Sequence, residues 1–222
     1  MMGVKKHIIY HNKMKRKTLQ RIVHFLVGKL THTEFIDAHR VPSEGGVIIA
    51  INHMSHLDTP IMMVNPARKD ITALVTTKYQ NRPLIRWFTN TAKGIWIDRD
   101  IADFSAVRKA AQALEDGWAL GIAPEGTRSK DARLQEGKPG TVMLAMKSGA
   151  PIVPVGITGT EDAFDKLKRL RKPHITVRFG QPFTLPEFEP HKRSEQLKRW
   201  TNILMGRIAE LLPEAYRGVY AE

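Results

Sequence analysis

The sequence predicts an α/β fold in which helices flank a largely parallel, mixed central sheet. From about residue 45, short apolar runs of strand length alternate with segments of helical periodicity. The chain has 222 residues, 42% of them hydrophobic, which is enough to bury the core of one such domain. A basic amphipathic helical segment precedes this alternation. Neither an internal repeat nor a low-complexity segment interrupts it.

Strands are predicted where β-branched and aliphatic residues run together, and helices where apolar residues recur at helical spacing. The predicted strands are residues 47–51, 71–75, 95–97, 118–123, 152–157 and 175–179. The predicted helices are residues 57–64, 83–91, 104–114 and 141–147, followed by a linker at 186–190 and a long amphipathic helix at 192–212. Because ligands bind beyond the carboxyl ends of the strands in such sheets, we expect the functional site in the segments that follow the strands.

Residues 1–40 are predicted to form a basic N-terminal segment that contacts a membrane, ahead of an α/β domain at residues 41–222. Lysines and arginines at positions 5, 6, 13, 15, 16, 17, 21 and 29 all precede the first acidic residue, Glu34. Apolar residues at 19, 22, 23, 26 and 30 predict an amphipathic helix. A basic helix of this kind suits an anionic phospholipid surface. The alternative is a terminal helix that packs on the domain and leaves its lysines in solvent.

The charge balance predicts an anionic partner, because the net charge is +13. Nucleic acid, an anionic membrane surface and phosphorylated substrates are the candidates. The absence of cysteine excludes disulfides, thiolate nucleophiles and Cys-ligated zinc. Apolar runs stay well short of the roughly 18–20 residues that cross a bilayer, and the first 30 residues lack the features of a signal peptide. We therefore expect a peripheral or monotopic protein on the cytoplasmic face of the membrane.

His53 and Asp58 are the first candidate catalytic residues. They directly follow the predicted strand at 47–51. A neutral imidazole can take the proton of an attacking hydroxyl, while a carboxylate on its other ring nitrogen fixes the tautomer and stabilises the imidazolium that forms. Such a pair needs no serine nucleophile if the acceptor's own hydroxyl attacks. The alternative is that Asp58 caps the helix that begins near Thr59 and Pro60.

Two further segments place cations after predicted strands. Arg99 follows the strand at 95–97, where a guanidinium can hold a phosphate by paired hydrogen bonds, although Asp98 and Arg99 also suit a surface ion pair. The segment at 123–129 carries Glu125, Gly126 and Arg128 after another strand, and its backbone N–H groups together with Arg128 can bind an anion.

Two prolines punctuate the apolar run at 150–157, which predicts an edge strand or a kinked wall beside a channel with a structural role.

Together these segments resemble the glycerolipid acyltransferase family of the HxxxxD type, whose best-known members are the lysophosphatidic acid acyltransferases. The family's Asn-His-x-Ser-x-x-Asp block is residues 52–58, and its Ile-Asp-Arg block is residues 97–99. Its Pro-Glu-Gly-Thr-Arg-Ser block is residues 124–129, and its Ile-Val-Pro-Val block is residues 152–155. Ala123 and Trp96 stand where the family usually has an aromatic residue and a phenylalanine, which predicts an altered pocket shape.

The resemblance implies transfer of a fatty acyl group from acyl-CoA or acyl carrier protein to the free hydroxyl of 1-acylglycerol 3-phosphate (lysophosphatidic acid), giving phosphatidic acid. It implies His53 as general base and Asp58 as its orienting partner. The residues implied in substrate binding, with the arginines on the phosphate, are Arg99, Glu125, Gly126, Thr127, Arg128 and Lys138. The reaction requires no metal or tightly bound cofactor.

Three alternatives stay open. An acyltransferase of the same family can use another acceptor, such as glycerol 3-phosphate, another lysophospholipid or a glycolipid. A metal hydrolase would use His53, His56 and Asp58 as ligands, but His53 and His56 at i, i+3 would need a shared helix, whereas His53 follows a strand, and no ligand elsewhere is evident. A nucleic-acid-binding protein would explain the sequence pI of about 10.1, yet no DNA- or RNA-reading motif occurs. The basic run at 166–172 suits phospholipid headgroups or an acidic carrier protein equally well.

Overall fold

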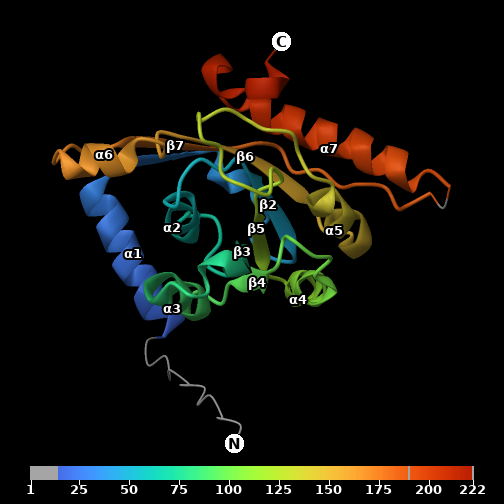
Figure 1. The fold of residues 1–222 in the computed structure, drawn as a ribbon, viewed down its shortest axis with the longest axis horizontal. Helices are drawn as coiled ribbons and strands as arrows, with labels where there is room; N and C mark the ends of the chain where they lie inside the picture. The colour runs from blue at the N-terminus through green and yellow to red at the C-terminus, as the bar shows by residue number, and fades with distance from the viewer. Residues whose placement is uncertain (1–14, 190, 222) are drawn as a thin grey trace, which may run out of the picture.

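The structure is a computed structural model that describes residues 15–189 and 191–221. In this part of the chain, seven strands form one sheet in the order β1-β7-β6-β2-β5-β3-β4 (Figure 1). The strands are β1 (His32–Ile36), β2 (Val47–Ile51), β3 (Ile71–Thr76), β4 (Ile95–Ile97), β5 (Ala119–Ile122), β6 (Ile152–Thr158) and β7 (His174–Phe179). β6 and β7 are antiparallel, whereas the other neighbours are parallel. The predicted mixed, largely parallel sheet is confirmed.

Helices cover both faces of this sheet. They are α1 (Arg16–Leu30), α2 (Asp58–Met63), α3 (Pro83–Thr91), α4 (Phe104–Glu115), α5 (Gly140–Ser148), α6 (Ala163–Lys168) and α7 (Arg193–Glu210). Alternate residues of β2 serve the two cores: Ile48 packs with residues of α4, α5 and α7, and Ile49 packs with residues of α2. The predicted helices therefore lie where the periodicity placed them, within a few residues at their ends.

The edge strand β1 is a difference from the predicted elements. It pairs in parallel with β7 and belongs to the sheet, although its residues fall inside the range 1–40. Its sequence mixes polar and apolar residues, and its side chains are partly or fully exposed. An edge strand with so little burial lacks the continuous apolar run by which the inner strands were predicted.

The strand β6 corrects the prediction of an edge strand at residues 152–157, because it lies inside the sheet between β7 and β2. Pro154 is tolerated there by a bulge. Val155 pairs with Phe179, and Ile152 forms a bridge with Phe183. The segment from Phe179 to Phe183 therefore contains one residue more than the segment of β6 that it faces, which is a β-bulge. The missing N–H of the proline falls where the ladder is already interrupted.

The helix α1 presents two apolar sides. Leu19 and Val23 are buried against Met63 and Phe88, as the alternative of a packed terminal helix requires. Ile22, Phe25, Leu26 and Leu30 are exposed by 41–62%. The basic and apolar residues predicted at positions 1–14 lie outside the described residues. Among the residues that the structure describes, the helices include none long and apolar enough to cross a membrane.

The strand β3 opens the sheet at its carboxyl end. Residues 71–73 pair with residues 119–121 of β5, whereas residues 74–76 pair with β4 instead. β3 therefore leaves β5 just beyond Ala73 and Gly121, which are paired in register. Both residues have small side chains or none, so little side-chain volume fills the space where the two strands separate.

Candidate active site

His53 and Asp58 form the pair that the sequence predicts. β2 ends at Ile51, and the following turn returns the chain so that Asp58 begins α2. The Nδ1 atom of His53 lies 2.8 Å from the Oδ2 atom of Asp58. A carboxylate oxygen accepts hydrogen bonds, so we infer that Nδ1 carries the proton and that Nε2 is left as the basic nitrogen. The His53 side chain is 19% exposed and lines a cavity, whereas Asp58 is completely buried.

Four donors surround the buried carboxylate of Asp58. Its Oδ2 accepts from the backbone N–H groups of Met54 and Ser55, both at 2.9 Å, as well as from His53. Its Oδ1 accepts from the hydroxyl of Thr160 at 2.6 Å. These bonds offset the desolvation of the carboxylate and hold it in one orientation. Asp58 therefore does more than begin a helix, because its side chain organises the whole turn from β2 to α2.

The chain just after β6 brings Thr160 to this site. Gly159 has a φ of +83°, and a Cβ atom there would lie 1.9 Å from the carbonyl oxygen of His174. A residue with a side chain does not fit this turn. The amide group of Asn52 exchanges hydrogen bonds of 2.7 and 2.9 Å with the backbone of Ile157, which ties the end of β2 to β6. The two strand ends that carry His53 and Thr160 are thus held together.

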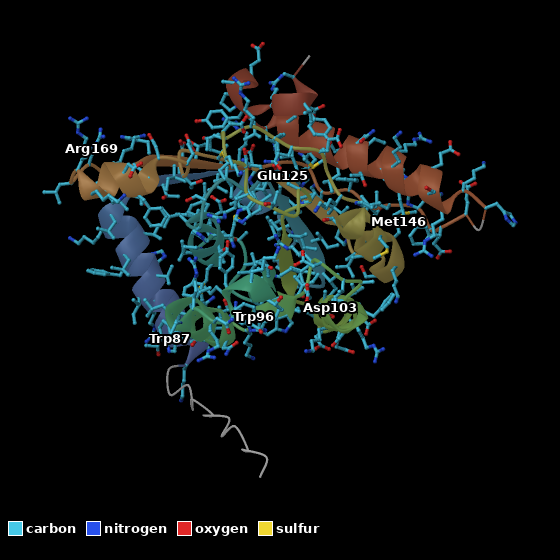
Figure 2. All side chains as sticks on the ribbon, viewed as in Figure 1. Trp87, Trp96, Asp103, Glu125, Met146 and Arg169 are labelled. Carbon is cyan, nitrogen blue, oxygen red and sulfur yellow. The ribbon has the colours of Figure 1, made fainter. Side chains whose placement is uncertain are left out.

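Glu125 supports the backbone of His53. It is 2% exposed, its Oε1 accepts from the His53 N–H at 2.8 Å, and its Oε2 accepts from the Gln135 N–H at 3.0 Å. Burial raises the pKa of Glu125 to about 7, against the two backbone N–H bonds, which lower it. The loop also holds His53 from its other side, because the Ser129 N–H donates to the His53 carbonyl at 2.8 Å. In Figure 2, Glu125 lies at the centre of the molecule.

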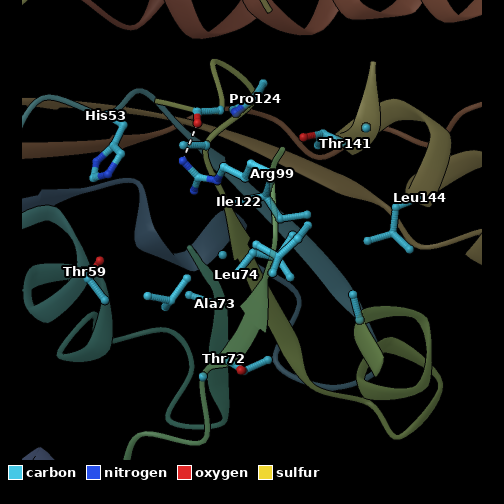
Figure 3. A pocket seen from close by; sticks show the side chains of 18 of the residues that line it. His53, Thr59, Thr72, Ala73, Leu74, Arg99, Ile122, Pro124, Thr141 and Leu144 are labelled. Carbon is cyan, nitrogen blue, oxygen red and sulfur yellow. Dashed lines mark hydrogen bonds between the residues drawn. The ribbon is translucent and has the colours of Figure 1, made fainter. Parts of the chain in front are cut away.

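Gly126 lies between two of the predicted cationic residues. Its φ is +69°, and its N–H donates to the Ala123 carbonyl at 3.0 Å within a turn. Its carbonyl accepts from the guanidinium of Arg99 (Figure 3). A Cβ atom at this position would lie 3.0 Å from the side chain of Lys138. The turn therefore favours glycine through its positive φ, and the missing Cβ leaves room for the side chain of Lys138.

Arg128 and Thr127 lie farther out. The guanidinium of Arg128 donates to the Tyr79 hydroxyl at 3.0 Å, and the guanidinium of Arg82 lies 5.5 Å from the centre of the same ring. The ring of His56 meets Tyr79 edge-on, and burial, followed by the charge of Arg128, lowers the pKa of His56. Thr127 is exposed. The guanidinium groups of Arg128 and Arg82 therefore both contact Tyr79, beside the turn that carries His53.

A cavity of about 370 Å³ begins beside His53 and extends between the layers. Met62 of α2 and Leu144 of α5 both line it, so it reaches both faces of the sheet through the opening between β3 and β5. Figure 3 shows His53, Arg99 and Pro124 at one end, with Leu74, Ile122 and Leu144 along the wall. The walls are largely apolar, as is usual for a site that takes a lipid or another apolar ligand.

The eight predicted site residues fall into three groups according to where they lie relative to the cavity. His53, Arg99, Gly126 and Lys138 line the cavity, and Asp58 and Glu125 are buried behind His53. Arg128 and Thr127 do not belong to the lining. The roles of these residues in substrate binding stay predictions, although the contacts of Glu125 indicate positioning of His53.

The sequence did not predict four residues that contribute to the site: Thr160, Gln135, Tyr79 and Arg82. Thr160 and Gln135 act through contacts with residues distant in the sequence, and nothing near them indicates a site. Arg82 and Tyr79 precede the Pro83 that begins α3, in a segment with no chemical motif. Of the two departures from the family pattern, Ala123 lines the cavity. Trp96, which is labelled in Figure 2, donates its indole N–H to Asn90 at 2.9 Å.

The metal-hydrolase alternative finds no support in the geometry. In the chain as described, no group of three or more His, Asp or Glu side chains is placed so that it could hold a metal ion.

Comparisons with known proteins give one consistent result. A family model described as Acyltransferase matches residues 32–158. The 1-acyl-sn-glycerol-3-phosphate acyltransferase of Limnanthes douglasii is 33% identical over 158 residues, which are 66% of this chain and 53% of that protein. The protein of the same name from Bacillus subtilis (strain 168) is 27% identical over 172 residues, 77% of this chain and 83% of that one. This chain spans about half the length of the Limnanthes relative.

A solved structure has the same fold. The crystal structure of the 1-acyl-sn-glycerophosphate (LPA) acyltransferase PlsC from Thermotoga maritima has a TM-score of 0.63 to this chain and 23% sequence identity. The match covers 85% of this chain and 80% of the other.

The raised pKa of Glu125 predicts a pH-dependent stability. Between pH 4.5 and about 7 the folded protein binds the proton that the unfolded chain has already released. The free energy of unfolding should therefore fall as the pH rises through this window and level off above it. The full contribution is on the order of 3 kcal/mol. Urea denaturation at several pH values should show this slope in the wild type and its loss in Glu125→Gln.

The exposed Glu44→Gln serves as the control and should keep the wild-type slope. Parallel curves for the wild type and Glu125→Gln would contradict the assignment.

Proposed function

Because this chain belongs to the acyltransferase family, we propose that it transfers a fatty acyl group from acyl-CoA or acyl carrier protein to the free hydroxyl of 1-acylglycerol 3-phosphate, giving phosphatidic acid. The observation that carries this proposal is the His53–Asp58 pair at the mouth of an apolar cavity, with Arg99 and Lys138 beside it. The curated relatives, which carry the name of this activity, support the choice of acceptor.

His53 serves as the general base. Its Nε2 takes the proton of the acceptor hydroxyl as the hydroxyl oxygen attacks the thioester carbonyl carbon. The tetrahedral intermediate then collapses, the carbon–sulfur bond breaks, and the imidazolium returns the proton to the leaving thiolate. Asp58 holds the ring through Nδ1 and stabilises the imidazolium while it exists. Protons balance over the cycle, and the protein supplies no nucleophile of its own.

The cavity accommodates an acyl chain. Its opening lies beside His53, and its walls come from apolar side chains on both faces of the sheet. A chain that enters between β3 and β5 brings its carbonyl end, or the glycerol attached to it, close to the base. The small pair Ala73 and Gly121 leaves room at this passage, since both line the cavity.

The cations near the mouth bind the acceptor's phosphate. Arg99 and Lys138 line the cavity on the two sides of Gly126, and Arg128 and Arg82 meet at Tyr79. Charge-assisted hydrogen bonds from guanidinium groups to phosphate are short and directional, and so fix the position of the glycerol hydroxyl.

The protein contacts an anionic phospholipid surface through α1. The outer apolar side of this helix, at Ile22, Phe25, Leu26 and Leu30, carries basic neighbours, and the whole chain has a charge of +13. Since anionic lipids enrich the cytoplasmic leaflet, we place the protein on that face. No step of the reaction calls for a metal or a bound cofactor.

The direct test offers the purified protein one labelled acyl-CoA together with a set of acceptors, and identifies the products by mass. We expect phosphatidic acid from lysophosphatidic acid, and no comparable product from glycerol 3-phosphate, lysophosphatidylcholine or a glycolipid. His53→Ala should abolish turnover and leave the unfolding transition in place, whereas the exposed His56→Ala should keep most of the activity. A near-normal rate for His53→Ala would refute the mechanism, and preference for another acceptor would refute the substrate.

Arg128→Met should chiefly raise the KM for lysophosphatidic acid, by roughly 10- to 100-fold, because a charge-assisted bond is worth about 1.5–3 kcal/mol. Arg99→Met should raise the KM and also lower kcat, because Arg99 holds the Gly126 carbonyl as well. Steady-state kinetics at varied acceptor concentration separate the two effects, with the exposed Arg108→Met on α4 as control. An unchanged KM for Arg128→Met would remove this residue from the phosphate site.

A further inference from the structure

The helix α6 ends in an unusual way. The N–H of Arg171 donates to the Lys166 carbonyl and the N–H of Leu170 donates to the Leu167 carbonyl, both at 2.9 Å. This is the Schellman arrangement, in which the residue after the helix adopts a left-handed conformation and is usually glycine. Here that residue is Leu170, with a φ of +56°.

Leu170 gains nothing from the fold in return. Its side chain is 96% exposed, the highest value among the exposed large hydrophobic residues of the described chain. A left-handed backbone is unfavourable for any residue with a Cβ, and an exposed leucine is not compensated by burial. Glycine would satisfy the same hydrogen bonds at lower cost. A contact with a partner outside the folded domain would account for a leucine at this position.

Cations surround this leucine. Residues 169–172, which we call the cationic tip, are Arg169, Leu170, Arg171 and Lys172, and all four are exposed. Asp162, just before α6, and Asp165 within it are paired with lysines of the helix, Asp162 with Lys166 at 2.8 Å and Asp165 with Lys168 at 3.0 Å. The three cations of the tip therefore leave a local excess of positive charge around one apolar side chain.

The cationic tip lies beside the end of α1. Pro173, which is buried directly after the tip, accepts a hydrogen bond of 2.9 Å from the N–H of His32. His32 also pairs with His174 in register, and their rings stack at 4.8 Å. Leu30, the last residue of α1, is two positions from His32 and is 45% exposed. Figure 1 shows α6 and α1 meeting at this end, and Figure 2 shows Arg169 extending outward there.

We propose that the cationic tip is a membrane-contact site, separate from α1, that binds an anionic phospholipid bilayer. Leu170 enters the boundary between headgroups and acyl chains, while Arg169, Arg171 and Lys172 bind lipid phosphates. The choice of a lipid as partner rests on the proposed function. An acidic carrier protein is the competing occupant, but a single leucine fully projecting from a cationic turn suits insertion into a bilayer better than a flat protein contact.

This site also sets the orientation of the enzyme. α6 follows Thr160 after two residues, and the hydroxyl of Thr160 holds Asp58. The tip and the catalytic pair are thus joined by a short, hydrogen-bonded stretch of chain. With α1 as the other contact, the bilayer surface meets the domain along a line from α1 to α6, which restricts how the cavity faces the lipid.

Vesicle flotation of the full-length protein tests the proposal, with vesicles of phosphatidylcholine alone or with 30% phosphatidylglycerol. Leu170→Gly should raise the melting temperature, because the left-handed strain is relieved, and should lower the partition onto anionic vesicles about tenfold. The charge variant Arg171→Gln/Lys172→Gln should lose binding to the anionic vesicles and show a shallower dependence on salt. Val219→Gly, which removes another exposed apolar side chain near the C-terminus, should bind as the wild type does.

A positive readout comes from Leu170→Trp. Its added fluorescence should be quenched by brominated lipids in anionic vesicles and should not change with phosphatidylcholine vesicles alone at physiological salt. Turnover of a short-chain lysophosphatidic acid below its critical micelle concentration should be the same in Leu170→Gly and in the wild type. If the wild type has no such turnover, the proposed function fails, while flotation still reports on the tip.

Two results would overturn the proposal. One is vesicle binding by Leu170→Gly that equals that of the wild type. The other is a raised KM for acyl carrier protein, with no change for acyl-CoA and none in flotation, which would assign the cationic tip to a protein partner.

Discussion

The buried carboxylate of Asp58 is the constraint on which the rest of the site depends. A completely buried carboxylate is tolerated when its oxygens are hydrogen-bonded, and here four donors supply those bonds. The donors come from the turn after β2 and from Thr160 after β6. Satisfying this one group therefore fixes the turn, the joint between two strands and the ring of His53 together. The fold thus holds the ring of His53, the proposed base, in one orientation, and such preorganisation is what makes a general base effective.

The loop at 123–138 completes the arrangement from the other side of His53. Glu125 and Ser129 hold the backbone of His53, and Gly126 accepts a hydrogen bond from Arg99 and leaves room for the side chain of Lys138. The separation of β3 from β5 then gives an apolar passage that begins where these groups meet. The His53–Asp58 pair, cations and an apolar cavity thus meet at one edge of the sheet, as the proposed reaction on a phosphorylated lipid requires. The exposed apolar and basic groups of α1 and the cationic tip are the surfaces that we propose to contact the bilayer from which such a lipid would come.

Much of this could be predicted from the sequence, because the signals are local. The pair His53 and Asp58 follows a fully apolar strand, and the five-residue spacing suits a turn into a helix. Continuous apolar runs predict the inner strands. Other features depend on contacts between distant residues. Thr160 is 102 positions from Asp58, and nothing around it marks it as a partner. The edge strand β1 is too polar to be predicted as a strand from its sequence. Pro154 suggests an edge strand when its sequence is read alone, because the bulge that accommodates it lies in a distant segment, between Phe179 and Phe183. Glu125 was predicted as a substrate ligand, whereas its observed contacts are two backbone N–H groups. The sequence motif is the same whether this glutamate binds substrate or positions the backbone, so the motif does not separate the two roles.

The central claim is that Asp58 fixes the imidazole of His53 with the proton on Nδ1 and a basic Nε2. Nitrogen-15 NMR of protein labelled in its histidine rings measures this directly, and the spectrum of His53→Ala identifies the signal among the nine histidines. At pH 8, where an ordinary imidazole is neutral, the account predicts a protonated Nδ1 and an unprotonated Nε2 for His53, with this preference lost in Asp58→Asn. A predominant Nε2–H tautomer in the wild type, or an unchanged spectrum in Asp58→Asn, would contradict it.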